Sequence, residues 1–306
     1  MVIPTRGRPG SLARVLDALA RQRGDVAFEA VVVSDGADPD PPASAHLVGG
    51  RPYPATHLVA SRPGAAAARN AGWRAASAPV ALFLDDDVVP SRRALAEHAA
   101  WHRRHHAPEV AVLGRVRWAR GLRGRAFRAW LDRGIQFDFG ALCPGQDAGW
   151  GAFYTANVSV KRDLLARAGG FDEERFPFHY EDLELAYRMR ALGLRLLYHP
   201  GAVAVHRHRV NVDDYARRMA EVAPAERRFA HAHPEVPPYF HRRLSTAAAA
   251  PQARGRGARL AGVVPPGVPW LGPRVWASAE AYFGQRLAPA FLAAWDAADV
   301  GSRVHG

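Results

Sequence analysis

Val80–Pro90 has the sequence Val-Ala-Leu-Phe-Leu-Asp-Asp-Asp-Val-Val-Pro. The apolar run Val80–Leu84 is typical of a short strand buried on both faces of a parallel sheet. Three carboxylates, Asp85–Asp87, follow at once, and ligands of open α/β sheets bind at the carboxyl ends of the strands. Because adjacent carboxylates repel each other, a divalent cation would stabilise them, and it usually brings a phosphate. The alternative is a solvated acidic turn that leads into a helix after Pro90.

Strands and helices alternate on both sides of this stretch, which predicts a doubly wound, mostly parallel α/β layer. Before it, we expect strands at Val2–Ile3, Phe28–Ser34 and Leu58–Ala60, a helix capped by Ser11, and the helix Ala65–Ala76. The first strand is so short that a few residues are expected to be missing before it. Two stretches rich in Pro, Gly or Arg are expected to be loops, namely Pro39–Pro54 and Arg117–Trp150.

After the acidic stretch the same patterns continue to about residue 208, and helical spacing predominates beyond it. The expected strands are Val110–Val116, Asn157–Val160, Arg195–Tyr198 and Ala202–Val205. The expected helices are Ala94–Arg104, Leu164–Ala168, Glu181–Leu192, Asp213–Ala232 and a segment within Trp276–Val300.

The 306 residues carry a formal net charge of +12, which favours anionic partners such as nucleotide phosphates, anionic lipid or nucleic acid. Lys161 is the only lysine, so nearly all the positive charge is arginine. We discount nucleic-acid binding, because the basic residues are spread along the chain and no binding motif interleaves them with aromatics.

Cys143 is the sole cysteine, which excludes an intrachain disulfide and a cysteine-based zinc site and predicts a reducing, cytoplasmic compartment. Met1–Gly7 does not resemble a signal peptide, and no apolar run is long enough for a transmembrane helix. Arg pairs and tryptophans after residue 211 suggest peripheral contact with the inner face of the plasma membrane, or else a soluble helical cap. They are Arg217, Arg218, Arg227, Arg228, Arg242, Arg243, Trp270, Trp276 and Trp295.

Several polar residues follow predicted strands or begin predicted helices, and each has an ordinary structural explanation. Asp35 could be a turn residue, and Arg69 a solvated residue on a helix. The carboxylates of Glu181–Asp182 could complement the dipole of the helix that they begin. His206 and His208 point to one face by strand alternation, and either could be an ordinary surface histidine.

Seven motifs follow one another along the chain: Pro4-Thr5-Arg6, Ser34-Asp35-Gly36, Arg69-Asn70-Ala71-Gly72, Asp85-Asp86-Asp87, Gly170-Phe171-Asp172-Glu173, Tyr180-Glu181-Asp182 and His206. Each is weak alone, but their order and spacing resemble those of the family 2 glycosyltransferases, inverting enzymes of the GT-A fold. The resemblance covers residues 2–208. It implies a GT-A domain over 1–210, with a nucleotide-sugar half (1–90) and an acceptor half (91–210), followed by a helical extension over 211–306.

The resemblance also implies roles on the donor side. Pro4, Thr5 and Arg6 would line the base and ribose of the nucleotide. Asp35 would accept a hydrogen bond from a base N–H, such as that of uracil, and Arg69 would lie near the base or the diphosphate.

The remaining implied roles concern the metal and the reaction. Asp85 and Asp87 would be an Asp-x-Asp pair for Mn²⁺ or Mg²⁺, with Asp87 the more direct ligand and Asp85 nearer the ribose. Asp86 belongs with the nucleotide-sugar residues, although its presence leaves the register of the pair open. His206 would be a further metal ligand, with His208 as its competitor. The last role is the general base, assigned to Asp182, while the adjacent Glu181 would position the acceptor or cap the helix.

The implied reaction moves one sugar, with inversion, from a nucleoside-diphosphate sugar to a hydroxyl of a glycan, a lipid-linked acceptor or a small molecule. A carboxylate on a rigid helix start can take the proton of that hydroxyl, and a metal stabilises the leaving diphosphate. The resemblance also implies a role in cell-envelope polysaccharide biosynthesis. No Gln-x-x-Arg-Trp motif is present, so a processive synthase is not implied.

Two alternatives stay open from the sequence. One is a catalytically silent sugar-nucleotide-binding or scaffold protein of the same fold. The other is a sugar nucleotidyltransferase, which requires a Gly- and Arg- or Lys-rich triphosphate loop. Arg6-Gly7-Arg8 is a faint echo of such a loop.

Overall fold

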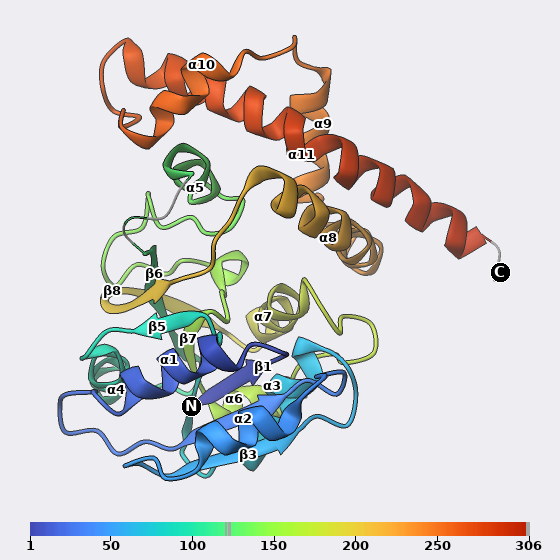
Figure 1. Ribbon diagram of the computed structural model, residues 1–306. Helices are drawn as coiled ribbons and strands as arrows, with labels where there is room; N and C mark the ends of the chain where they lie inside the picture. Colours follow the sequence, from blue (N-terminus) through green and yellow to red (C-terminus); the bar gives the residue numbers. More distant parts are fainter. Residues whose placement is uncertain (120, 122–123, 304–306) are drawn as a thin grey trace. The chain divides into compact units, whose positions relative to one another are not determined.

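The computed structural model describes residues 1–119, 121 and 124–303, and the chain divides into two compact units (Figure 1). Unit 1 comprises Met1–Ala119 and Ala141–His208. Unit 2 comprises the described residues of Arg120–Gly140 and Arg209–Gly306. An inserted segment, 121–140, therefore belongs with the C-terminal unit that we expected to begin at residue 211.

Unit 1 is organised around an eight-stranded sheet of order β3-β2-β1-β4-β7-β6-β8-β5. The strands are β1 (Val2–Thr5), β2 (Ala30–Ser34), β3 (Ala55–Val59), β4 (Val80–Leu84), β5 (Val88–Pro90), β6 (Val110–Trp118), β7 (Asn157–Lys161) and β8 (Arg195–His206). The pairs β1–β2, β2–β3, β1–β4 and β6–β8 are parallel, and β4–β7, β6–β7 and β5–β8 are antiparallel. The predicted mostly parallel α/β architecture is confirmed, and β4 is the buried strand expected from Val80–Leu84.

The helices of unit 1 are α1 (Pro9–Leu19), α2 (Pro41–Val48), α3 (Ala65–Ala75), α4 (Ala94–Arg104), α6 (Arg162–Arg167) and α7 (Glu181–Ala191), with a 3₁₀ turn, η1 (Trp150–Ala152). The predicted Ser11 cap is wrong: α1 begins at Pro9, because proline fits the first helical position. The predicted loop Pro39–Pro54 is wrong where α2 lies. Asp40 caps α2 by accepting from Ala43 N, and the prolines that suggested a loop occupy its first turn.

One strand, β8, replaces the two predicted at Arg195–Tyr198 and Ala202–Val205. A register shift after Gly114 on β6 accommodates the Pro-Gly interruption that had suggested two strands. A Cβ on Gly114 would lie 2.2 Å from Asn157 Nδ2, so glycine permits this close approach. The far end of β8 pairs with β5, which sets His206 opposite Val88, directly after the acidic triplet.

Unit 2 is helical, as expected for the C-terminal extension. It contains α5 (Arg125–Leu131), α8 (Val212–Ala232), α9 (Tyr239–Ala249), α10 (Gly255–Ala258), the 3₁₀ turn η2 (Arg259–Gly262) and the long helix α11 (Leu271–Arg303) (Figure 1). The predicted loop Arg117–Trp150 is wrong at α5, whose Trp130 donates to Glu280 on α11 at 2.7 Å. Arg243 on α9 closes an ion pair of 2.6 Å with the same carboxylate. In the described part of the chain, no helix is long and apolar enough to span a bilayer.

Candidate functional site

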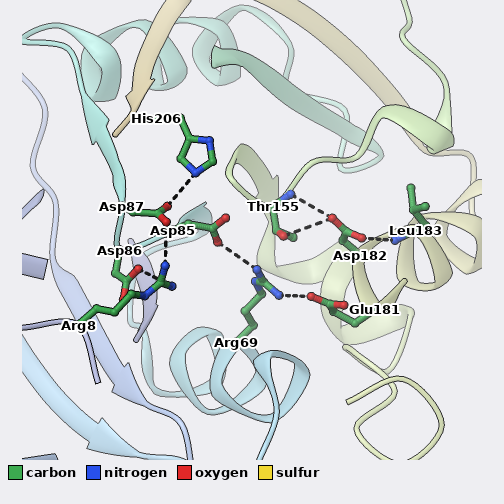
Figure 2. Close-up of polar contacts among 10 residues, drawn as sticks. All are labelled: Arg8, Arg69, Asp85, Asp86, Asp87, Thr155, Glu181, Asp182, Leu183 and His206. Atoms are coloured by element: carbon green, nitrogen blue, oxygen red, sulfur yellow. Dashed lines mark hydrogen bonds and ion pairs between the residues drawn. The ribbon is translucent and has the colours of Figure 1, made fainter. Parts of the chain in front are cut away.

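The acidic triplet, whose three side chains are labelled in Figure 2, follows the carboxyl end of β4, and β4 pairs in parallel with β1. Asp86 has a fully buried side chain, that of Asp87 is 10% exposed, and that of Asp85 is 33% exposed. Thr5, the last residue of β1, donates its hydroxyl to Asp86 Oδ2 at 2.7 Å. The parallel pairing of these strands thus brings two of the predicted nucleotide-sugar residues together.

One guanidinium forms ion pairs with two of the three carboxylates. Arg8, which precedes α1, places Nη1 2.8 Å from Asp87 Oδ2 and Nη2 2.7 Å from Asp86 Oδ1. Burial raises the pKa of Asp86 to about 7, although Arg8 and the hydroxyl of Thr5 act in the opposite direction. Burial would also raise the pKa of Asp87, but the hydrogen bond and charge of His206, together with Arg8, lower that pKa well below its usual range.

His206 is the nearer of the two candidate histidines. Its Nε2 lies 3.3 Å from Asp87 Oδ1, whereas His208 Nδ1 lies 3.9 Å from Asp87 Oδ2 and its side chain is half exposed. The indole of Trp118 stacks on the imidazole of His206, with ring centroids 4.7 Å apart, and so limits the movement of the imidazole. The β5–β8 pairing thus brings together Asp87 and His206, two of the three predicted metal ligands.

Arg69, on α3, connects the acidic triplet to the start of α7. Its Nη2 lies 3.1 Å from Asp85 Oδ1, and its Nη1 lies 2.6 Å from Glu181 Oε1 (Figure 2). The guanidinium is buried and also lies over the ring of Phe171, 5.9 Å from its centroid. Among the described residues, Glu181 Oε2 is buried and has no hydrogen-bond partner, so this oxygen is available to a ligand hydroxyl.

Asp182 has no such cation in hydrogen-bond contact among the described residues; its bonds come from a hydroxyl and from backbone. Thr155 approaches Oδ2 with its hydroxyl at 3.4 Å and its amide at 3.5 Å, while the amide of Leu183 donates to Oδ1 at 2.9 Å. Burial and the neighbouring charge of Glu181 raise the pKa of Asp182 to about 7, despite the nearby Arg69. A carboxylate with such a pKa can accept a proton near neutral pH.

The backbone immediately before α7 is strained. His179 and Tyr180 both have left-handed φ angles, 59° and 61°, although neither is glycine. Such residues cost about 1–3 kcal/mol each and concentrate at functional sites. Here they set the direction in which Glu181 and Asp182 leave the preceding loop.

The other predicted donor-side residues lie nearby, and each already has a local contact. Pro4 and Thr5 end β1, and Arg6 is exposed, with its guanidinium 6.0 Å from the ring centroid of Phe178. Asp35 is buried and accepts from two backbone amides, those of Ala37 at 2.7 Å and Gly64 at 2.9 Å. The base contact of Asp35 therefore stays a prediction alongside a structural role.

The side chains of this site have the right ligand atoms for a divalent cation, but their positions match a metal site less well. Carboxylate oxygens and an imidazole nitrogen are ligands of Mn²⁺. Within residues 1–119, 121 and 124–303, however, no three His, Cys, Asp or Glu side chains converge as a metal site would require. Asp85 bonds to Arg69, and Arg8 holds one oxygen of Asp87. A cation bound by Asp87 and His206 would therefore compete with Arg8.

Two residues of this site were not predicted from the sequence. Arg8 stands two residues after Arg6 and was noted only within Arg6-Gly7-Arg8, the faint echo of a triphosphate loop. Thr155 carried no signal, because it lies in an irregular segment before β7 and reaches Asp182 only through the fold.

Comparison with known proteins identifies relatives of the chain. The chain is 31% identical over 226 residues to the validoxylamine A glucosyltransferase of Streptomyces hygroscopicus subsp. jinggangensis, covering 63% of this chain and 51% of that protein. It is 29% identical over 242 residues to the pre-mycofactocin glycosyltransferase of Mycobacterium tuberculosis, covering 77% and 48%. The chain thus spans about half the length of the curated relatives that it matches.

Solved structures share the fold at low sequence identity. The S. aureus TarS 1–349 structure in complex with UDP superposes with a TM-score of 0.53 and 15% identity, covering 98% of this chain and 90% of that one. The mannosyltransferase PcManGT of Pyrobaculum calidifontis, in complex with GDP-Man and Mn²⁺, gives 0.54 and 20%, covering 98% and 85%. The fold is therefore that of GT-A glycosyltransferases. A family model described as "Glycosyltransferase like family 2" matches residues 1–221, and the chain belongs to that family.

Proposed function

We propose that this chain is a metal-dependent, inverting, non-processive glycosyltransferase that moves one sugar from a nucleoside-diphosphate sugar to an acceptor hydroxyl. The observation that carries the proposal is the buried connection Asp85–Arg69–Glu181, which joins the acidic triplet to the helix that bears Asp182. The acidic triplet and the carboxylates at the start of α7 are thereby held at a fixed distance from each other. Such an arrangement suits a donor on one side and an acceptor on the other.

On the donor side, Asp87 and His206 are the proposed metal ligands, and Asp85 and Arg69 would lie toward the ribose and diphosphate. When bound, Mn²⁺ or Mg²⁺ would neutralise the negative charge that develops on the leaving diphosphate. Arg8 is paired with Asp87 in the structure and would release this carboxylate as the cation binds. The nucleotide itself stays open, since UDP and GDP-Man occupy different structural neighbours.

On the acceptor side, Asp182 is the proposed general base. In the transfer, the acceptor oxygen forms a bond to the anomeric carbon while the bond from that carbon to the diphosphate oxygen breaks. The bonding pair leaves with the diphosphate, and the hydroxyl proton passes to Asp182. The hydrogen bonds from Thr155 and Leu183 orient the carboxylate for this step. The buried Oε2 of Glu181, which lacks a hydrogen-bond partner among the described residues, would hold a sugar or acceptor hydroxyl.

The acceptor class stays broad. The relatives are named for validoxylamine A and for pre-mycofactocin, so we propose a hydroxyl of a small molecule or glycan as the first substrates to test. A lipid-linked acceptor, as in cell-envelope polysaccharide synthesis, would require the enzyme to work at a membrane surface.

The test is product identification with purified protein. Nucleoside-diphosphate sugars of uridine and guanosine are incubated with Mn²⁺, and mass spectrometry follows the release of nucleoside diphosphate. A thermal-shift screen of nucleoside diphosphates with Mn²⁺ first selects the base, because ligand binding stabilises the folded state by mass action. Release of pyrophosphate from a sugar phosphate and a nucleoside triphosphate would instead indicate a nucleotidyltransferase. Stabilisation without any turnover or donor hydrolysis would indicate a silent binding protein.

A further inference from the structure

Unit 2 contains a long stretch without acidic residues. Between Glu235 and Glu280 there is no Asp or Glu, and the stretch carries six arginines: Arg242, Arg243, Arg254, Arg256, Arg259 and Arg274. Arg243 is engaged with Glu280, whereas Arg254, Arg256, Arg259 and Arg274 are exposed. These last four lie around η2 and the entry to α11, so positive charge accumulates at this end of unit 2.

The same end of unit 2 exposes large apolar side chains. Leu260 is 43% exposed, Val263 62%, Trp270 83% and Leu271 47%. In the described part of the chain only Val59 and Tyr239 are comparable, so four of six such side chains fall within twelve consecutive residues. Apolar exposure concentrated in this way, with a basic border, marks an interaction site.

Hydrogen bonds to backbone carbonyls hold the apolar residues together as one feature, the α11 entry loop (residues 260–272). The carbonyl of Leu260 accepts from the amides of Val263 and Val264 at 2.9 and 2.8 Å. The carbonyl of Val264 accepts from Trp276 Nε1 at 3.0 Å, which ties the first half of the loop to α11. Gly272 N donates to Val268 O at 2.8 Å, which closes the second half. Val263 and Trp270 are thereby presented at the same end of the helix.

Trp270 is the distinctive residue of the loop. It has a left-handed φ of 63°, which a residue with a Cβ adopts only at a cost. Its side chain is the most exposed of the large apolar side chains described, so packing within unit 2 does not repay that cost. Strained backbone that presents a solvent-exposed indole indicates a function outside the fold.

We propose that the α11 entry loop and its four flanking arginines bind an anionic membrane surface. Trp270 and Leu271 enter the boundary between lipid headgroups and acyl chains, where the amphipathic indole is favoured. The guanidinium groups contact lipid phosphates, for which their planar fork is suited. Charge complementarity favours anionic lipid over an uncharged apolar partner, because each arginine near such a surface increases the affinity of the protein for it about fivefold.

This surface differs from the set of arginines and tryptophans suggested by the sequence. Trp276 bonds to Val264, and Trp295 packs on His241 with ring centroids 4.3 Å apart. Arg227 donates to the carbonyl of Trp295. These side chains are used inside unit 2, which leaves Trp270 as the tryptophan available for insertion.

The test measures sedimentation of the whole chain with vesicles, and it is independent of the proposed transfer because no donor is needed. Vesicles of phosphatidylcholine mixed with phosphatidylglycerol are compared with vesicles of phosphatidylcholine alone, at low and high salt. We expect binding to the mixed vesicles at low salt that weakens as salt screens the charges. Binding to both vesicle types with equal affinity, or to neither, would overturn the proposal and leave a protein partner as the occupant.

Two sets of variants locate the surface. Arg256→Gln with Arg259→Gln should reduce partition into the mixed vesicles about 25-fold, from about fivefold for each charge. The matched control, Arg103→Gln with Arg104→Gln on α4 of unit 1, removes the same charge from exposed positions and should leave partition almost unchanged. An equal loss of partition in both double variants would show that binding depends on net charge alone, and it would overturn the assignment to this loop.

The second variant is Trp270→Gly, which removes the indole and relieves the left-handed strain, so the melting temperature should not fall. We expect weaker vesicle binding at every salt concentration. The difference in fluorescence between the unsubstituted chain and this variant should shift to the blue when mixed vesicles are added. A Trp270→Gly chain that binds like the unsubstituted one would contradict insertion of the loop.

Discussion

Asp87 and Asp182 are chemically identical side chains that the fold places in opposite electrostatic settings. Asp87 lies between Arg8 and His206, and its pKa is lowered. Asp182 has hydroxyl and amide partners and an acidic neighbour, Glu181, and burial with that neighbour raises its pKa to about 7. The contrast teaches that the fold keeps Asp87 ionised and keeps Asp182 able to exchange a proton.

The most severe change would remove the proton acceptor. Asp182→Asn keeps the size and polarity of the side chain but cannot take a proton at neutral pH. Turnover should fall about 10²–10⁴-fold, the usual contribution of general-base catalysis, while the dissociation constant of the donor stays nearly constant. Steady-state kinetics and calorimetric titration of the donor measure the two effects.

Glu181→Gln is the matched control for that variant. It should act mainly on the KM of the acceptor, because Glu181 offers an oxygen to a hydroxyl without taking its proton. Near-normal turnover in Asp182→Asn with a large loss in Glu181→Gln would mean that the two roles are exchanged. Two active variants would place the base elsewhere.

Asp87→Ala tests the other aspartate of the comparison, the one that is kept ionised. Loss of a direct ligand should weaken Mn²⁺-dependent nucleotide binding by about 100-fold or more, since even outer partners of metal ligands contribute 10–100-fold. Isothermal titration of nucleoside diphosphate with and without Mn²⁺ measures this, and circular dichroism checks the fold. Unchanged metal dependence would remove the metal assignment. His206→Ala should reproduce much of the loss and His208→Ala little, because His206 is the nearer to Asp87.

The raised pKa of Asp182 predicts a pH dependence. The base acts when it is deprotonated, so turnover should rise with pH and level off above about 7. Below that value it should fall about tenfold per pH unit, as expected for one ionisation. Turnover is measured below saturation, as kcat/KM, so that the profile reports the unliganded enzyme to which this pKa belongs. The residual activity of Asp182→Asn should lack this limb; a limb that persists belongs to another group.

The smallest expected effect concerns Arg8. Arg8→Gln removes the guanidinium that competes for Asp87, so the affinity for Mn²⁺ should rise about fivefold, as expected for a partly exposed ion pair worth about 1 kcal/mol. Without metal, the melting temperature should fall, because buried Asp86 loses its cation. Arg6→Gln, in the same loop but over Phe178, is the control and should change neither quantity. Weaker binding of metal and nucleotide in Arg8→Gln would make Arg8 a phosphate ligand instead.

Local patterns were sufficient where the signal lies within a few residues. The apolar run before Asp85 predicted β4, and the spacing within 181–192 predicted α7. Local patterns failed where one residue type is compatible with two different structural roles. Prolines near residue 41 suggested a loop but occupy the first turn of α2. Tryptophans at 270 and 276 looked equivalent in the sequence, yet one is exposed and the other bonds to Val264.

The sequence by itself determined the alternation of strands and helices, the acidic triplet at the end of β4, and the order of motifs that identifies the family. Only the tertiary structure decided that Arg8 pairs with both Asp86 and Asp87, and that Arg69 connects Asp85 to Glu181, 112 residues away from it in the sequence. The physical reason is that the charge state of a carboxylate depends on burial and on groups within a few ångströms. Those neighbours come from distant parts of the chain, so no local pattern distinguishes an aspartate held ionised from one that can accept a proton.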